Sequence, residues 1–123
     1  MITAGKTATV STIVTDKNTA KAVGSGSLDV FSTPMMIALM EQAACECLAD
    51  GLEPGQTSVG TQINAEHTQA SPIGETITAT ATIDSTDGRK ITFVVSAKSA
   101  TNEIGKGTHT RFIINAERFM SKI

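Results

Sequence analysis

The chain has 123 residues, which is enough for one domain with a single hydrophobic core and too few for two well-packed ones. Its formal net charge of -2 excludes the broad basic surface of a nucleic-acid-binding protein and the polybasic arm that binds anionic membranes. The first residues lack the pattern of a signal peptide and no segment approaches the length of a membrane span, so we expect one cytoplasmic domain over residues 1–123.

Five segments have the alternating polar and apolar pattern of strands in an antiparallel sheet with one face in solvent. They are rich in Thr, Val and Ile, and they cover residues 6–15, 57–68, 75–85, 90–100 and 105–116. The Asp87-Gly88 pair predicts a tight hairpin between the third and fourth segments.

A single helix is predicted between the first two strands, over residues 34–50. Thr33 is a candidate N-cap, Pro34 suits the first helical position, and Gly51 follows the last turn. Residues 16–29 before it are polar and contain glycine, which predicts a loop. One helix must then cover the apolar face of five strands, so we expect an α+β fold in which the twisted sheet curls around it.

Glu41 does not fit an ordinary core helix. At about 100° per residue, the polar stripe of the predicted helix contains Gln42, Glu46 and Asp50, whereas Glu41 shares its face with apolar residues such as Ile37. Burial of an unpaired carboxylate is costly, so we expect Glu41 to have a partner or to keep its proton.

His67 is the candidate partner of Glu41. Strict alternation in the second strand places His67 on the apolar face, together with Val59, Thr61, Ile63 and Ala65. The same alternation places Ser58, Gln62, Asn64, Glu66 and Thr68 on the other face. A buried acid on a helix and a buried imidazole on the facing strand are the components of an acid/base or nucleophilic site.

Each of these residues also has an ordinary structural explanation. A single inward His or Glu is more often a hydrogen-bonded or ion-paired core residue than a catalyst, and Thr33 alone is more often a cap. Arg111 lies on the strand face opposite to Phe112 and Ile114, so it is expected to pair with a surface acid or across an interface.

Taken together, the spacing of these residues is distinctive. Thr33-Pro34 is followed by Glu41 eight residues after the Thr and by His67 twenty-six residues after the Glu. This set resembles the catalytic residues of the fluoroacetyl-CoA thioesterase-like branch of the hotdog-fold thioesterases. The similarity covers nearly the whole chain, through TPMMIALMEQAA, TSVGTQINAEHTQASPIGE, DGRKITFVV and IGKGTHTRF.

The resemblance implies a hotdog domain, an antiparallel sheet wrapped around one long central helix. It also implies a homodimer joined at the sheet edges, with the active sites at the interface; pairing of dimers into tetramers is left open. Thr33, Glu41 and His67 would be the catalytic residues, Gly60 would offer its backbone N–H to the thioester carbonyl, and Arg111 would be an active-site or CoA-side residue. The substrate would be an acyl-CoA thioester, with no metal and no further cofactor.

The acyl group is expected to differ from that of the type enzyme. Bulky Phe side chains before the helix form a lid in that enzyme, and residues 24–27 of this chain are Gly-Ser-Gly-Ser in roughly the same region. We therefore expect a short or medium acyl group without selectivity for fluoroacetyl.

The mechanism and two rival functions stay open on the sequence alone. Glu41 would either attack the thioester carbonyl or act as general base on water, with Thr33 orienting its carboxylate and His67 assisting the departing sulfur or the water. The rivals are a hydratase or dehydratase of acyl thioesters, for which no second inward acid is visible, and a non-catalytic acyl-CoA-binding module. A pure assembly protein would have no reason to bury Glu41 and His67.

Overall fold

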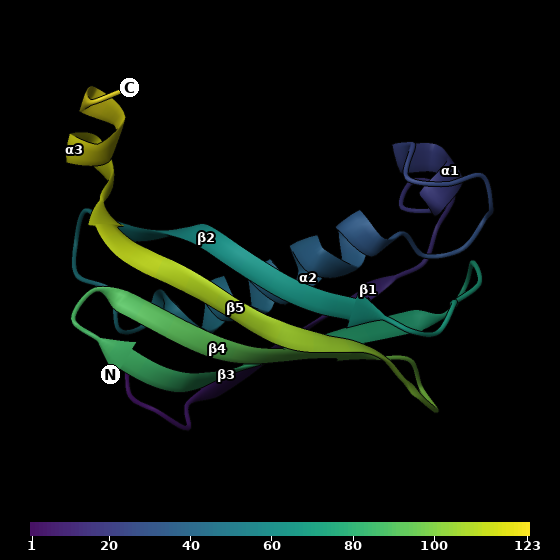
Figure 1. The fold of residues 1–123 in the computed structure, drawn as a ribbon, viewed down its shortest axis with the longest axis horizontal. Helices are drawn as coiled ribbons and strands as arrows, with labels where there is room; N and C mark the ends of the chain where they lie inside the picture. Colours follow the sequence, from purple (N-terminus) through teal and green to yellow (C-terminus); the bar gives the residue numbers. More distant parts are fainter.

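The computed structural model describes all residues, 1–123, and contains one five-stranded antiparallel sheet (Figure 1). The strands are β1 (Thr7–Ile13), β2 (Gln56–His67), β3 (Thr76–Asp87), β4 (Lys90–Lys98) and β5 (Glu103–Asn115), in the spatial order β1-β3-β4-β5-β2. All five predicted strands are confirmed, with ends that differ by up to two residues. The expected turn at Asp87-Gly88 joins β3 to β4, where Asp87 pairs with Lys90.

The long helix α2 (Thr33–Ala49) lies along one face of the sheet (Figure 1). Its seven buried residues meet the apolar residues of β3, β4 and β5 in one core. This confirms the predicted α+β architecture. The predicted cap is wrong by one residue, because the Ser32 side chain accepts a hydrogen bond from the backbone N–H of Met35 and Thr33 is the first helical residue. Thr33 is therefore free to bond elsewhere.

Two short helices were not predicted. Helix α1 (Ala20–Val23) lies within the segment that was expected to be a loop, capped by the side chain of Thr19 and ended by Gly24 at φ 79°. Helix α3 (Ala116–Ser121) follows β5 directly and is capped by Asn115. Helices of four and six residues are too short to show a 3.6-residue apolar period, so the sequence pattern did not reveal them.

Strand β2 forms one edge of the sheet and carries an irregularity in its middle. It pairs only with β5, and the register shifts between Gly60, which lies opposite Arg111, and Gln62, which lies opposite Thr110. The extra residue, Thr61, reverses the alternation of side chains on either side of it. The predicted faces of β2 therefore hold from Ile63 to His67 and fail before the bulge, where Ser58 lies beneath Arg111.

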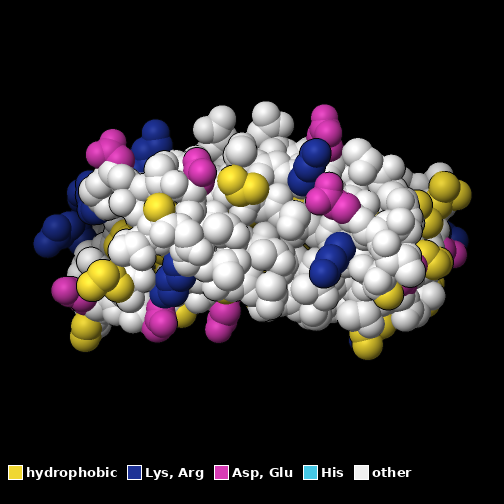
Figure 2. All heavy atoms as spheres, turned by 90° about the horizontal axis from the view of Figure 1, so that it is seen from below, with side chains coloured by type: hydrophobic (Ala, Val, Ile, Leu, Met, Phe, Trp, Pro, Cys, Tyr) yellow, Lys and Arg dark blue, Asp and Glu magenta, His cyan; other side chains and the backbone are white.

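The outside of the molecule has no extended apolar area on the face that Figure 2 shows, where acidic and basic side chains are interspersed. None of the helices is long and apolar enough to cross a membrane.

Candidate active site

Glu41 lies midway along α2, and its partner is Arg111. Its Oε2 accepts a hydrogen bond of 3.0 Å from Arg111 Nη1, and its side chain is 40% exposed. The expectation that this acid has a partner is confirmed. The prediction that the partner within the chain is His67 is wrong.

Arg111 is buried and reaches across the inside of the sheet. Its Nε donates to Ser58 Oγ at 2.9 Å and its Nη2 donates to the Ser58 carbonyl at 3.1 Å, while Nη1 faces Glu41. The expected outward position of Arg111 is wrong, because β5 turns Arg111 inward and leaves Phe112 and Ile114 only partly buried. The run of apolar residues from 112 to 114 fits either face, so its pattern could not decide the orientation of the strand.

His109 is a member of this cluster that the sequence reasoning missed. Its Nδ1 lies 2.7 Å from the carbonyl oxygen of Gln62, and because a carbonyl only accepts, Nδ1 carries the proton. In the neutral ring Nε2 is then an acceptor, 3.2 Å from Arg111 Nη1 and 3.8 Å from Glu41 Oε2. Burial lowers the pKa of His109; the Gln62 carbonyl opposes the shift and the Arg111 charge adds to it, which favours this neutral tautomer. The spacing of two residues between His109 and Arg111 on one strand was the available signal.

Gly60 leaves room for these three side chains. It lies opposite Arg111 in the β2–β5 ladder, and a Cβ atom there would be 2.6 Å from Glu41 Oε2, 3.0 Å from Arg111 Nη1 and 3.1 Å from His109 Cε1. Its φ is not positive, so glycine is needed here for space and not for backbone conformation. Its expected role as a donor to a thioester carbonyl stays a prediction.

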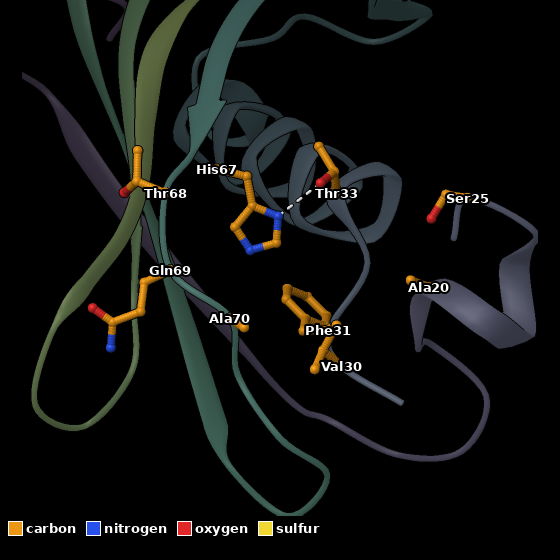
Figure 3. Close-up of a pocket in the computed structure, with 9 residues that line it drawn as sticks. All are labelled: Ala20, Ser25, Val30, Phe31, Thr33, His67, Thr68, Gln69 and Ala70. Carbon is orange, nitrogen blue, oxygen red and sulfur yellow. Dashed lines mark hydrogen bonds between the residues drawn. The ribbon is translucent and has the colours of Figure 1, made fainter. Parts of the chain in front are cut away.

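Thr33 and His67 form a second polar pair, at the other end of β2. The first residue of α2 and the last residue of β2 meet there, with Thr33 Oγ1 2.8 Å from His67 Nδ1 (Figure 3). The other ring nitrogen, Nε2, is buried and has no hydrogen-bond partner. Burial lowers the pKa of His67, so the ring is neutral at neutral pH and can accept a proton.

A hollow of about 250 Å³ opens beside this pair. The residues around it come from α1, the segment before α2 and the end of β2, and they are Ala20, Ser25, Val30, Phe31, Thr33, His67, Thr68, Gln69 and Ala70. In Figure 3 the ring of His67 points toward Thr33 on one side and has Phe31 near it on the other. An unsatisfied imidazole nitrogen at the wall of a small, partly apolar hollow is suited to a polar ligand atom.

The two polar clusters are separate within one chain. Thr33 and Glu41 are eight residues apart on α2, a rise of about 12 Å, and Thr33 bonds His67 instead of Glu41. Each cluster combines one residue of α2 with residues of β2 or β5. The charged cluster contains Glu41, Arg111 and His109, and the neutral cluster contains Thr33 and His67. No three His, Cys, Asp or Glu side chains are grouped closely enough to hold a metal ion.

Comparison with known proteins gives a consistent family. A sequence profile described as fluoroacetyl-CoA-specific thioesterase (FlK) matches residues 14–117. The chain is 45% identical over 95 residues to the fluoroacetyl-CoA thioesterase of Streptantibioticus cattleyicolor, covering 77% of this chain and 68% of that protein.

Solved structures agree with the sequence comparison. The crystal structure of a point variant of the thioesterase FlK superposes with a TM-score of 0.93 at 37% identity, covering 99% of this chain and 95% of that one. A thioesterase superfamily member from Thermus thermophilus has the same fold, with a TM-score of 0.91 at 24% identity over 99% of this chain and 90% of that one. The chain therefore belongs to the fluoroacetyl-CoA-specific thioesterase family and is a thioester hydrolase with the hotdog fold.

Proposed function

We propose that the protein is a homodimeric acyl-CoA thioesterase for short or medium acyl groups, with Glu41, His67 and Thr33 as its catalytic residues. The observation that carries the proposal is the arrangement around Glu41. A partly exposed carboxylate is held at one oxygen by a buried arginine and lies against a glycine, where any side chain would press on that oxygen. Such a group is oriented and accessible, as a nucleophile or a general base must be.

The free edge of β2 supports a dimer in which each active site takes residues from both chains. The strand has 12 residues, pairs on one side only, and presents unpaired backbone groups along its other side. If two copies pair antiparallel along β2, the His67 end of one strand lies beside the half of the partner strand that contains Gly60. The Thr33–His67 pair of one chain would then approach Glu41 of the other, which one chain alone cannot achieve.

The proposed reaction is hydrolysis of a thioester. Either Glu41 attacks the carbonyl carbon, giving an acyl-enzyme anhydride that water then opens, or it removes a proton from water as water attacks. In both routes the carbon–sulfur bond breaks, a new carbon–oxygen bond forms, and the thiolate receives the proton. His67, fixed by Thr33 through Nδ1, would act through its free Nε2 on the departing sulfur or on the water. The N–H of Gly60 would donate to the oxyanion, and loss of such a donor typically costs about 3 kcal/mol.

The size of the hollow beside His67 supports a short or medium acyl group. About 250 Å³ is slightly below the range of about 300–1,000 Å³ that is usual for ligand pockets. Ser25, from the Gly-Ser-Gly-Ser stretch, lies at its wall and brings no bulk to it. We therefore propose that the enzyme is not selective for fluoroacetyl-CoA.

Release of free thiol from a panel of acyl-CoA esters of increasing chain length tests the proposal. We expect turnover of short and medium esters by the parent, without preference for fluoroacetyl-CoA. Glu41→Gln and His67→Ala should each lower kcat at least about 10²-fold, in line with general acid/base contributions. Absence of turnover across the panel with retained binding would favour a binding module, and near-parental kcat in either folded variant would remove that residue from the mechanism.

Mixing the two inactive variants tests the shared site. In a heterodimer of Glu41→Gln with His67→Ala, one composite site would lack both residues and the other would be intact. Random exchange of subunits should therefore restore about a quarter of the parental activity. If each chain holds a complete site, the mixture stays as inactive as its components.

A further inference from the structure

A small hollow at the end of β5 is surrounded by positive charge. It measures about 120 Å³ and lies between α3 and the turn that joins β3 to β4. Its lining residues are Arg89, Ile114, Asn115, Arg118, Phe119 and Lys122. Three of these six are cations and none is an acid, although the chain as a whole has a net charge of -2.

None of the three cations is neutralised within the chain. The only Lys or Arg contacts with a carboxylate within 4.0 Å are Lys6 with Asp50 and Arg111 with Glu41. Figure 2 shows basic side chains projecting at the left end of the molecule, with acidic ones around them, and α3 and the β3–β4 turn lie at this end in Figure 1. Like charges gathered around one hollow repel each other and create a local field that favours an anion.

Hydrogen bonds of the backbone fix the two elements that carry these side chains. The N–H of Ile113 donates to the Arg89 carbonyl at 2.9 Å, which ties the β3–β4 turn to β5. Helix α3 is started by Asn115, whose Oδ1 accepts from the Arg118 N–H at 2.9 Å, and is anchored by a hydrogen bond from Ala116 N–H to the Gly55 carbonyl. The cations of the turn and of the helix thus line the same hollow.

We propose that this basic hollow binds the phosphorylated nucleotide of coenzyme A while the thioester lies at Glu41. Guanidinium groups match phosphate oxygens in charge and geometry, and two of the three cations are arginines. Phe119, which is 37% exposed, and Ile114 add an apolar wall of the kind on which a base can stack. The inference rests on the proposed function and selects coenzyme A over an acyl carrier protein, whose pantetheine arm carries no nucleotide.

The distance along β5 agrees with the length of the thiol arm. Arg111, which holds Glu41, is four residues before Asn115 on the same strand, about 13 Å at the usual rise. The pantetheine arm has as many bonds between its sulfur and its first phosphate oxygen as four residues of backbone, so when extended it spans a similar distance of about 13–14 Å. The hollow includes Ile114, on the face of β5 away from Glu41, so the arm ends at the edge of the sheet and the pyrophosphate that follows it passes around this edge into the hollow.

Two substrates with the same thioester distinguish a test of this inference from a test of the proposed function. An acyl-pantetheine keeps the reacting group and lacks all phosphates and the base. We expect Arg118→Ala to raise KM for the acyl-CoA about tenfold with little change in kcat, as for loss of a hydrogen bond to a charged group. It should leave the kinetics with acyl-pantetheine unchanged. Arg118→Glu should have a larger effect of the same kind, and Lys98→Ala, an exposed lysine on β4, is the matched control without effect.

Binding of adenosine 3′,5′-bisphosphate, measured by calorimetry, gives a readout that does not depend on hydrolysis. We expect the parent to bind it, Arg118→Ala to bind it at least about tenfold more weakly, and the compound to compete with acyl-CoA. Thermal unfolding checks that the exposed Arg118 is replaced without loss of fold. Equal effects of Arg118→Ala on both thioesters, or binding that is the same in parent and variant, would overturn the inference. If no thioester is hydrolysed and the bisphosphate still binds at Arg118, the nucleotide site stands and the proposed function fails.

Discussion

Replacement of Gly60 by alanine is a direct test of how the charged cluster is assembled. The new Cβ would lie 2.6 Å from Glu41 Oε2, 0.8 Å short of the 3.4 Å at which ordinary contact begins, and it would also press on Arg111 and His109 at 3.0 and 3.1 Å. All three contacts are with side-chain ends. The Glu41 carboxylate is 40% exposed, so it can move away by the required distance.

We expect this shift to affect activity far more than stability. A misplacement of about 1 Å in a catalytic group can cost 10²-fold in rate, so kcat of Gly60→Ala should fall between about 10-fold and 10²-fold. The free energy of unfolding should change by less than about 1 kcal/mol, because alanine fits this backbone conformation and restricts the unfolded chain.

The assay is steady-state thiol release together with denaturant unfolding, with Thr57→Ala, an exposed change on the same strand, as the control. Parental kcat in Gly60→Ala would show that turnover does not depend on the position of the Glu41 carboxylate. A large loss of stability would show that the backbone, and not the carboxylate, gives way.

Three further changes test other features of the structure. His109→Phe removes the acceptor for Arg111 Nη1 and the donor to the Gln62 carbonyl, so the free energy of unfolding should fall by about 1–3 kcal/mol and kcat should fall with it. His109→Gln should restore part of both quantities, and equal behaviour of the two variants would contradict the assigned tautomer. Burial lowers the pKa values of His67 and His109, so the unfolded chain binds more protons than the folded chain as the pH falls below about 6.5. The stability contributed by the two neutral rings, measured by urea unfolding, should be fully present above that pH and decline below it. A stability that rises on acidification would refute this sign. Gly107→Ala would place a Cβ 2.0 Å from the Asn64 carbonyl oxygen, which belongs to the backbone and cannot turn away as a side chain can. We therefore expect the free energy of unfolding to fall by about 1–3 kcal/mol or more, unlike in Gly60→Ala, and thermal unfolding of the two variants side by side checks the contrast.

The sequence by itself determined the five strands, the long helix and the exceptional position of Glu41 on it. Alternating Thr, Val and Ile residues require strands with one solvent face, and the apolar run after Pro34 requires a buried helix, so the α+β architecture followed from periodicity alone. Glu41 was identified because a carboxylate on an apolar helix face needs a partner, and the structure supplies one.

Only the tertiary structure decided which partner that is. The bulge at Thr61 reverses the faces of β2, and the apolar run from residue 112 to 114 fits either orientation of β5, so strict alternation placed Ser58 and Arg111 on the wrong sides. Register and bulges depend on how strands pair across the sheet, which a single strand does not encode. The same pairing brought Arg111 and His109 beside Glu41 and His67 beside Thr33, because residues distant in the chain meet only once the sheet has closed around the helix.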